Sequence, residues 1–526
     1  MKIERILKPI VVVILVSTLA LQACGAQGTP VPTPQQPAQM GGNEQPAMTG
    51  TGRRGILRVA IQPLVQIDPA NISSDQEVFA LSQIYDYLVD VTPENTIAPR
   101  LAKSWTVSED GLVYTFQLEE GVTFHDGTPF TARDVVWTFD RLRNPASGYP
   151  TADLYAGIDR IEATGELEVT FKLNRVNPFF LFDLSDYHAL ILKENTADPT
   201  QFNGTGPFKV VEYNPEDRLI LQANEAYFVE GQPKLQGVEI IFFNTPEAIL
   251  TALRGGQVDL VFALSTDQYG SLKGESGITL LETPSNLFDV VRLRSDRAPG
   301  NDPRVMKALK LGLDREAIYR LVMAGYGRIG RDSPIGPMYT AYYSEETPLP
   351  TRDVEAAKKL LAEAGYPNGL QIDLYTPDSG DRPQLAVVLK NQWADIGVEV
   401  NVNVMPESVY YGDGGWLEVD LGITSWGSRP YPQFYLDVML KCNAKWNESH
   451  FCDAEFDQLA TTAGTTSDEA KRVAAYKAIQ KLLIERGPII VPYFYTQLGA
   501  IRSTFQGFVL KPFSGRSDLR PVSYVE

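Results

Sequence analysis

The stretch RLAKSWTVSEDGLVYTFQLEEGVTFHDGTPFTARDVVWTFDRL, residues 100–142, decides the fold of this chain. Apolar residues alternate with polar ones through three short segments, 105–107, 112–118 and 122–124, and Asp-Gly pairs separate or follow them. A period of two combined with Asp-Gly turns is typical of antiparallel strands joined by tight turns. The stretch therefore predicts a meander of three short strands.

The period of the apolar residues changes at Thr131. Asp134 follows three residues later, which is the spacing of a capping box at the start of a helix. Four apolar side chains then share one helical face: Val135, Val136, Phe139 and Leu142. We expect a unit in which the three strands pack against this helix.

The sequence of this stretch resembles the signature of family 5 solute-binding proteins, the peptide and nickel type that serves ABC importers. The matching positions are Leu101-Ala102, Ser104-Trp105, Asp110-Gly111, Tyr114, Phe116, Phe124, Asp126-Gly127 and Ala132-x-Asp134-Val135. Further along, residues 204–208 (GTGPF) are similar to the family's Gly-Thr-Gly-Pro-aromatic motif, and residues 314–318 (DREAI) are similar to its Asp-Arg-x-x-Ile block.

The resemblance implies an α/β fold of the two-lobed periplasmic-binding-protein type (type II, large class), with an extra subdomain on the first lobe. It places the first lobe at residues 55–288 plus 490–526, the extra subdomain at about residues 100–200, and the second lobe at residues 289–489. The pattern of predicted elements agrees with this division into two lobes, because a β-rich half is followed by alternating helices and strands. Two lobes joined by crossing strands would enclose a ligand in the cleft between them.

The N-terminus has the pattern of an export signal. Lys2, Arg5 and Lys8 precede an apolar run over residues 9–21, which is too short to cross a bilayer as a helix. We expect a signal peptide over residues 1–23.

Residues 21–24 (LQAC) resemble a bacterial lipobox, which implies lipidation of Cys24 after cleavage. Residues 24–54 are rich in Pro, Gln, Gly and Thr, and such a composition cannot bury a core, so we expect a disordered tether. The protein would then be anchored in the cell envelope, outside the cytoplasmic membrane. The alternative is an ordinary signal peptide cut nearby, with Cys24 incidental.

Two further cysteines, Cys442 and Cys452, remain as a possible pair in an exported, oxidising compartment. Dipeptide-binding members of the family resemble this chain in having a cysteine pair around an equivalent loop, ahead of a Phe-x-x-Leu helix that corresponds here to residues 456–459. We expect a disulfide; two free buried thiols are the alternative.

The formal net charge of −18 argues against nucleic acid or anionic headgroups as partners. With 44% hydrophobic residues the chain has enough core for two or three domains, and no second run is long and uncharged enough to cross a membrane. We expect a monomer that delivers its solute to ABC permease subunits.

The predicted ligand site follows the strand at residues 419–426, because ligands of open α/β sheets sit outside the carboxyl ends of the strands. This loop brings Trp426, Ser428, Arg429 and Tyr431. In peptide-binding relatives the loop resembles Trp-x-x-Asp-x-Pro-Asp-Pro, and its aspartate anchors the ligand's amino terminus. Here the loop offers Arg429, so we expect an acidic ligand group at this point.

A free amine of the ligand would be held by a carboxylate elsewhere, for which Asp68, Asp75 and Asp289 are candidates. Two alternatives stay open: Trp426 can belong to the lobe core, and Arg429 can pair with a surface carboxylate.

The sequence offers no catalytic machinery. A hydrolase needs a nucleophile and a base, but there is no Gly-x-Ser-x-Gly elbow and only three histidines are present, His125, His188 and His450. No His-x-x-x-His or Cys-x-x-Cys spacing indicates a metal. We expect no enzyme, no cofactor and no resident metal. The expected cargo is a peptide; a sugar, an opine-like acid or a metal chelate is the alternative, and a structural lipoprotein or a hydrolase is a remote one.

Overall fold

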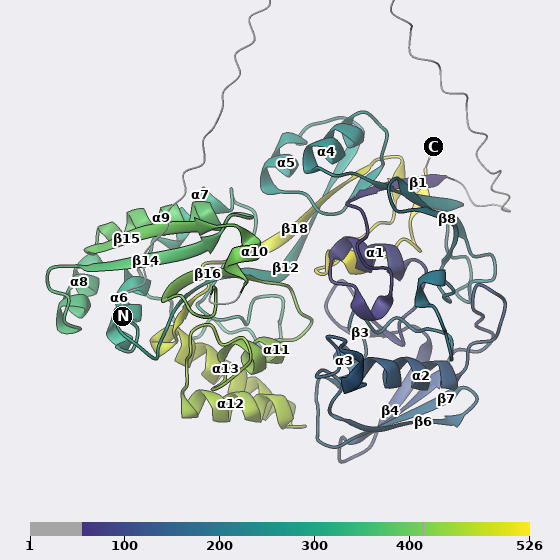
Figure 1. Cartoon of the computed structure of the whole chain (residues 1–526), viewed down its shortest axis with the longest axis horizontal. Coiled ribbons are helices and arrows are strands. Elements are labelled where there is room, and N and C mark those ends of the chain that lie inside the picture. The colour runs from purple at the N-terminus through teal and green to yellow at the C-terminus, as the bar shows by residue number, and fades with distance from the viewer. Residues whose placement is uncertain (1–54, 413–414, 526) are drawn as a thin grey trace, which may run out of the picture. The chain divides into compact units, whose positions relative to one another are not determined.

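The computed structural model describes residues 55–412 and 415–525, in which a mixed sheet of twelve strands runs through the molecule. Figure 1 shows this sheet and the helices around it. Its central path is β15 (Val398–Met405), β14 (Leu370–Pro377), β16 (Leu421–Trp426), β12 (Ile278–Leu293), β18 (Tyr493–Arg502), β11 (Leu260–Val261), β1 (Ile56–Ile61), β10 (Gly237–Phe242), β9 (Arg218–Ala223) and β8 (Phe208–Asn214). The predicted signal peptide, Cys24 and the tether lie outside the described residues.

Strands β12 and β18 connect the two halves of the sheet. They pair antiparallel from Ile278 opposite Arg502 to Phe288 opposite Phe494, with an irregular register between Pro284 and Phe288. Strand β12 also pairs antiparallel with β16 on one side, and β18 pairs antiparallel with β11 on the other. This is the arrangement expected of two lobes joined by two strands, and we keep the names first and second lobe for the predicted ranges. Their boundaries stay a prediction, because residue 288 lies inside a continuous strand.

The second lobe has the predicted βα organisation. Strand β14 runs parallel to both β15 and β16, and α9 (Arg382–Ala394) provides the crossover from β14 to β15. The apolar core includes Trp393, whose indole N–H donates to the carbonyl of Leu309 at 3.0 Å. The other helices of this region are α6 (Pro303–Leu311), α7 (Arg315–Val322), α8 (Val354–Glu363), α10 (Glu407–Tyr410), α11 (Gln433–Tyr435), α12 (Ala454–Thr465) and α13 (Glu469–Arg486).

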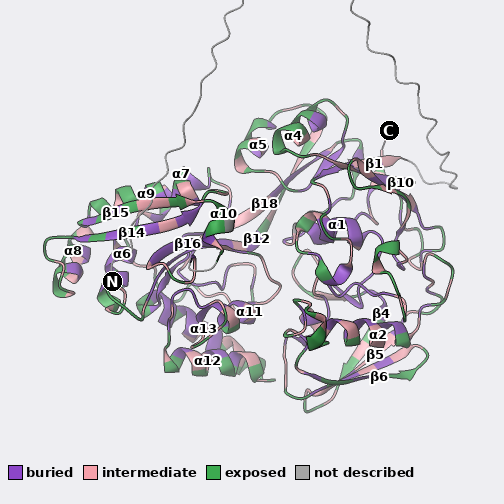
Figure 2. Cartoon of the chain, viewed as in Figure 1, coloured by how far each residue is buried: buried purple, intermediate pink, exposed green. Residues whose placement is uncertain are grey.

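Figure 2 shows that α12 and α13 each have one buried and one exposed side. Just before α12, Cys442 and Cys452 form the predicted disulfide, with their Cα atoms 4.5 Å apart. In the part of the chain that the structure describes, no helix is both long and apolar enough to cross a membrane.

The predicted extra subdomain contains residues 100–142. Thr131 and Asp134 form the predicted capping box at the start of α2, and Figure 1 shows this helix above a separate small sheet. The phenyl rings of Phe139 on α2 and Phe171 on the sheet meet edge to face, 5.3 Å apart. The elements are β4 (Ala102–Val107), β5 (Val113–Leu118), α2 (Ala132–Leu142), β6 (Ile158–Gly165) and β7 (Glu168–Leu173), with strand order β4-β5-β7-β6.

The prediction of a third strand at residues 122–124 is wrong. Residues 122–130 close on themselves through the Asp126-Gly127 turn, so Thr123 and Pro129 form only an isolated bridge. Gly127 has a φ of +84°, which a turn this tight requires and which glycine adopts without strain. The strand that pairs with β5 in its place is β7, which lies about fifty residues further along the chain.

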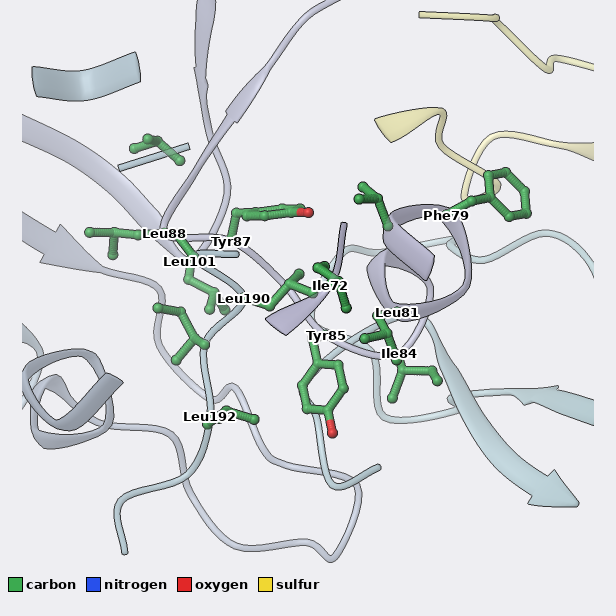
Figure 3. Packing of buried hydrophobic residues seen from close by; sticks show 14 of the residues in the cluster. Ile72, Phe79, Leu81, Ile84, Tyr85, Tyr87, Leu88, Leu101, Leu190 and Leu192 are labelled. Atoms are coloured by element: carbon green, nitrogen blue, oxygen red, sulfur yellow. The ribbon is translucent and has the colours of Figure 1, made fainter. Parts of the chain in front are cut away.

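The core of the first lobe packs around the turn that follows α1 (Asp75–Ser82). Figure 3 shows Ile72, Leu81 and Ile84 converging here, with Tyr85 beside them. Gly204 and Gly206 lie against the backbone of Ile84, and a Cβ on either would approach its carbonyl oxygen to 2.5 Å or less. The Gly-Thr-Gly-Pro motif is therefore explained by close packing of two backbones.

The remaining elements are short. They are η1 (Pro69–Asn71), β2 (Val89–Val91), β3 (Ile97–Pro99), η2 (Pro145–Ser147), α3 (Phe180–Asp183), η3 (Pro199–Gln201), α4 (Pro246–Arg254), α5 (Thr266–Ser271), β13 (Arg328–Ile329), η4 (Leu436–Leu440), β17 (Ile489–Ile490), β19 (Phe505–Gln506), η5 (Ser514–Arg516) and β20 (Ser523–Tyr524).

Candidate ligand-binding site

A cavity of about 390 Å³ lies where the loop after β16 faces the first lobe. The second lobe contributes residues 427–431 to its wall, and the first lobe contributes residues 73–75, residues 182–188 and part of the C-terminal segment at residues 512–516. The loop after β16 reaches this place because it leaves the carboxyl end of a central strand. Both lobes therefore contact whatever occupies the cavity.

Arg429 supplies a positive charge to the cavity wall. Its guanidinium lies over the ring of Phe434, 4.4 Å from the centroid, and 5.9 Å from the centroid of Tyr187. Among the described residues no carboxylate is in direct ion-pair contact with it. Burial favours a lower pKa for Arg429, but the neighbouring Tyr187 and the carboxylate of Asp186 outweigh it and raise that pKa. The stacking rings leave the planar edge of the guanidinium as the part that can bind a planar anion.

Tyr431 lines the same cavity and bonds to the first lobe. Its phenol donates a hydrogen bond to one carboxylate oxygen of Asp183, and Asn177 donates to the other at 2.7 Å. The Tyr431 ring stacks on Phe179, with centroids 4.7 Å apart. Burial raises the pKa of Asp183 to about 7, and these two hydrogen bonds only partly oppose that effect.

Asp186 and His188 form a second polar pair in the wall. The Nδ1 atom of His188 lies 2.6 Å from the Asp186 carboxylate, and the backbone N–H of His188 donates to the same oxygen at 3.0 Å. Burial favours the neutral acid, but the electrostatic attraction of His188, these hydrogen bonds and the charge of Arg429 outweigh it and hold the pKa of Asp186 below its usual value. The other ring nitrogen, Nε2, is buried and has no hydrogen-bond partner among the described residues.

Ser428 lines the cavity, whereas Trp426 does not. The Ser428 hydroxyl accepts a hydrogen bond from the backbone N–H of Asn286 at 3.1 Å, which ties the loop to β12. Trp426 is buried behind the loop, where its indole N–H donates to Glu448 at 3.0 Å and its ring packs against Trp446. The structure thus places Trp426 in the lobe core, the alternative left open by the sequence.

The three candidate aspartates lie in different places. Asp75 lines the cavity at the start of α1. Asp68 caps η1 and forms an ion pair with Arg141. Asp289 is fully buried on β12, where it accepts hydrogen bonds from the phenols of Tyr493 and Tyr495 at 2.8 and 2.7 Å. Neither Asp68 nor Asp289 contributes to the cavity wall.

Sequence reasoning missed α3 and the segment that follows it, which bring Asp183, Asp186, Tyr187 and His188 to the cavity. The available signal was Asp183, Asp186 and His188 within six residues of one another, directly downstream of three phenylalanines. In the described part of the chain, no cluster of three or more His, Cys, Asp or Glu side chains is placed to hold a metal ion.

Two lobes joined by two strands, with a cavity walled by both, define a solute-binding protein of the periplasmic type. The family model of the bacterial extracellular solute-binding proteins, family 5 Middle, matches residues 96–447. The chain belongs to this family, whose members are binding proteins and not enzymes and serve ABC import.

Several named relatives are similar over most of their length. The chain is 29% identical to Di/tripeptide-binding protein 2 of Pseudomonas aeruginosa (strain UCBPP-PA14) over 85% of this chain and 91% of the relative. It is 28% identical to Heme-binding protein A of Haemophilus influenzae (strain ATCC 51907 / DSM 11121 / KW20 / Rd), over 82% of this chain and 85% of the relative.

Solved structures support the fold. The binding protein DppA from Helicobacter pylori, in complex with peptide STSA, superposes with a TM-score of 0.74 at 25% identity, covering 90% of this chain and 98% of that one. AgaA from A. tumefaciens R10, in complex with agropinic acid, also reaches a TM-score of 0.74, at 22% identity, covering 90% and 99%.

Proposed function

We propose that this protein captures a short peptide in the cavity between its lobes and delivers it to the permease subunits of an ABC importer. The names of relatives support this choice, because a di/tripeptide-binding protein and a dipeptide-binding protein are both 28–29% identical to this chain. The cavity volume of about 390 Å³ lies within the usual range of small-ligand sites.

The observation that carries the proposal is the charge pattern of the cavity. Arg429 makes no direct ion-pair contact with a carboxylate among the described residues, although Asp186, which lies with Asp183 in the first lobe's part of the wall, raises its pKa. A buried or half-buried charge is stable only when it is paired and hydrogen-bonded, so this cation calls for an anionic ligand group. A zwitterionic ligand with a carboxylate at one end and an amine at the other fits both walls.

The proposal includes a lipid anchor. Cleavage before Cys24 and acylation of this residue would hold the binding lobes at the outer face of the cytoplasmic membrane, close to the permease. A single protomer would suffice, because one chain supplies both walls of the cavity.

Native mass spectrometry of protein purified without refolding tests the identity of the bound solute, because the mass of a co-purified molecule identifies it. Calorimetry with free di- and tripeptides, a sugar, an opine-like acid and a nickel–histidine chelate then ranks the ligand classes. We expect the peptides to bind in the micromolar range or tighter, roughly −8 kcal/mol or better. Binding of only the sugar, the opine-like acid or the chelate would replace the peptide in this proposal, and binding of none would contradict it.

A further inference from the structure

Trp446 lines the cavity from the loop that the Cys442–Cys452 disulfide closes. Its ring meets that of Trp426 at a steep angle, with centroids 6.1 Å apart, and the ammonium of Lys445 lies 5.6 Å from its centroid. Trp426 is 7% exposed and does not reach the cavity, whereas Trp446 is only half-buried. The second tryptophan of this pair therefore keeps apolar ring surface that a ligand can cover.

The backbone of the disulfide loop holds this ring in place. The N–H of Trp446 donates to the carbonyl of Val438 at 2.9 Å. The side-chain amide of Asn447 donates to the carbonyls of Lys441 and Phe451, at 3.0 and 2.7 Å, so hydrogen bonds close the loop beside the disulfide. A contact residue that is fixed before binding loses little conformational entropy when a ligand arrives.

Glu448, two residues further on, joins the disulfide loop to the end of β16. Its carboxylate is 1% exposed and accepts hydrogen bonds from the indole of Trp426 at 3.0 Å and the hydroxyl of Thr424 at 2.6 Å. Arg292 on β12 donates to the same carboxylate at 3.1 Å. Strand β16 leads into the loop at residues 427–431, so one buried carboxylate supports both parts of the second lobe's wall.

Other apolar side chains share the cavity with Trp446. Half-buried ones come from both lobes, namely Leu154, Phe182, Phe434 and Phe513. Transfer of such surface from water to an apolar ligand group is favourable, and aromatic rings gain further from offset or edge-to-face contacts with another ring. The cavity can therefore bind an apolar side chain as well as charged ends.

We infer that Trp446 forms a side-chain subsite of this cavity and selects peptides that carry an aromatic or large aliphatic side chain. This inference rests on the proposed function and adds the class of peptide to it. The sequence pointed to Trp426 as the tryptophan that contacts the ligand. The structure assigns that role to Trp446, twenty residues further along.

The probe is the tightest-binding free peptide of the di- and tripeptide panel, together with analogues that carry Ala or Phe at each position in turn. Calorimetry gives the affinity of each analogue. At one position of the peptide, we expect the Phe analogue to bind the wild type at least about tenfold more tightly than the Ala analogue, because its phenyl ring is buried against the subsite.

Substitutions at Trp446 test whether this residue causes the preference. In Trp446→Ala the difference between the Phe and Ala analogues should fall below about threefold, while the Ala analogue stays within about threefold of its wild-type affinity. Trp446→Phe keeps a ring and should keep most of the preference. The matched control is Trp105→Ala, because Trp105 is also half-buried, packs on Phe116 and does not line the cavity.

The possible failures are distinguishable. If no peptide binds the wild type, the proposed function fails and the inference fails with it. If peptides bind but Phe and Ala analogues bind equally, the inference alone fails. It also fails if Trp446→Ala weakens all analogues by the same factor, since a merely structural role would do that.

Hydroxyl-radical footprinting of the wild type, read by mass spectrometry, needs no variant and decides the case in which Trp446→Ala does not fold. Oxidation of Trp446 should fall on saturation with the Phe analogue and fall much less with the Ala analogue. Oxidation of Trp105 should not change with either. Equal oxidation of Trp446 with and without the Phe analogue would overturn the inference.

Discussion

The phenol of Tyr431 donates a hydrogen bond to the carboxylate of Asp183, and this bond joins the loop after β16 to helix α3. The contact is reinforced nearby, because the side chain of Asn95 donates to the Pro430 carbonyl at 2.7 Å and Phe179 stacks on Tyr431. A group whose pKa is about 7 thus lies in a contact between the predicted lobes. Its protonation connects pH with the stability of the cavity wall.

Asp183 should make the protein less stable as the pH rises from about 4 to 7. The unfolded carboxyl has a pKa near 3.8 and the folded one near 7, so between these values the native state binds the proton and the unfolded state does not. The free energy of unfolding therefore falls with pH in this window, by at most about 1.4 kcal/mol per pH unit. Asp183→Asn, which cannot ionise, should lack this slope.

Urea unfolding of both proteins at pH 4.5, 6 and 7.5 measures the difference. Other groups titrate in both proteins and cancel when the variant is subtracted from the wild type. Parallel curves for the two proteins would contradict a raised pKa at Asp183.

The fold was largely predictable because its signals are local. The Thr131–Asp134 capping box, the alternation in residues 112–118 and the βα order after residue 370 each depend on neighbours in sequence, and each appears in the structure. The missing third strand is different: residues 122–124 alternate correctly, but no partner strand is within reach once the Asp126-Gly127 turn closes.

Only one wall of the cavity was predictable. Ser428, Arg429 and Tyr431 could be placed because they follow a central strand at its carboxyl end. The wall of the first lobe comes from the end of α3 and the irregular backbone after it, and no local sequence pattern indicates that residues 182–188 approach a loop about 240 residues away. Trp426 shows a further limit, since strand alternation does not reveal which side chains meet Glu448 and which face the cavity.

Reduction of the Cys442–Cys452 bond should destabilise the protein. The bond closes a loop of ten residues' separation, and the chain-entropy account of such a loop gives roughly 2.5 to 3 kcal/mol. Urea unfolding with and without reductant measures this loss, and the Cys442→Ser/Cys452→Ser double variant, which should not respond to reductant, is the control. Thiol titration of unfolded, unreduced protein should find neither cysteine free; two reactive thiols would contradict the disulfide.

Cys24→Ser should release the protein from the membrane fraction. An acyl anchor depends on the thiol, and residues 9–21 are too short to hold the chain in a bilayer as a helix. Fractionation of cells that express the two forms, with blotting for the binding lobes, decides the point. A variant that stays with the membrane would show that the anchor is not at Cys24.

Arg429→Ala should weaken ligand binding more than any other single change in the loop after β16. If the guanidinium forms a charge-assisted pair with a ligand carboxylate, removing it leaves that carboxylate unpaired and costs roughly 2 to 5 kcal/mol of affinity. Arg429→Lys keeps the charge but loses the planar fork and the stacking on Phe434, so it should recover only part of the loss.

Arg297→Ala is the matched control, because Arg297 is exposed, pairs with Asp420 and does not line the cavity. Calorimetry with the co-purified ligand measures all four proteins. A loss below about 0.5 kcal/mol, the size expected of an exposed ion pair, would mean that Arg429 only shapes the loop and that another group receives the ligand's acidic end.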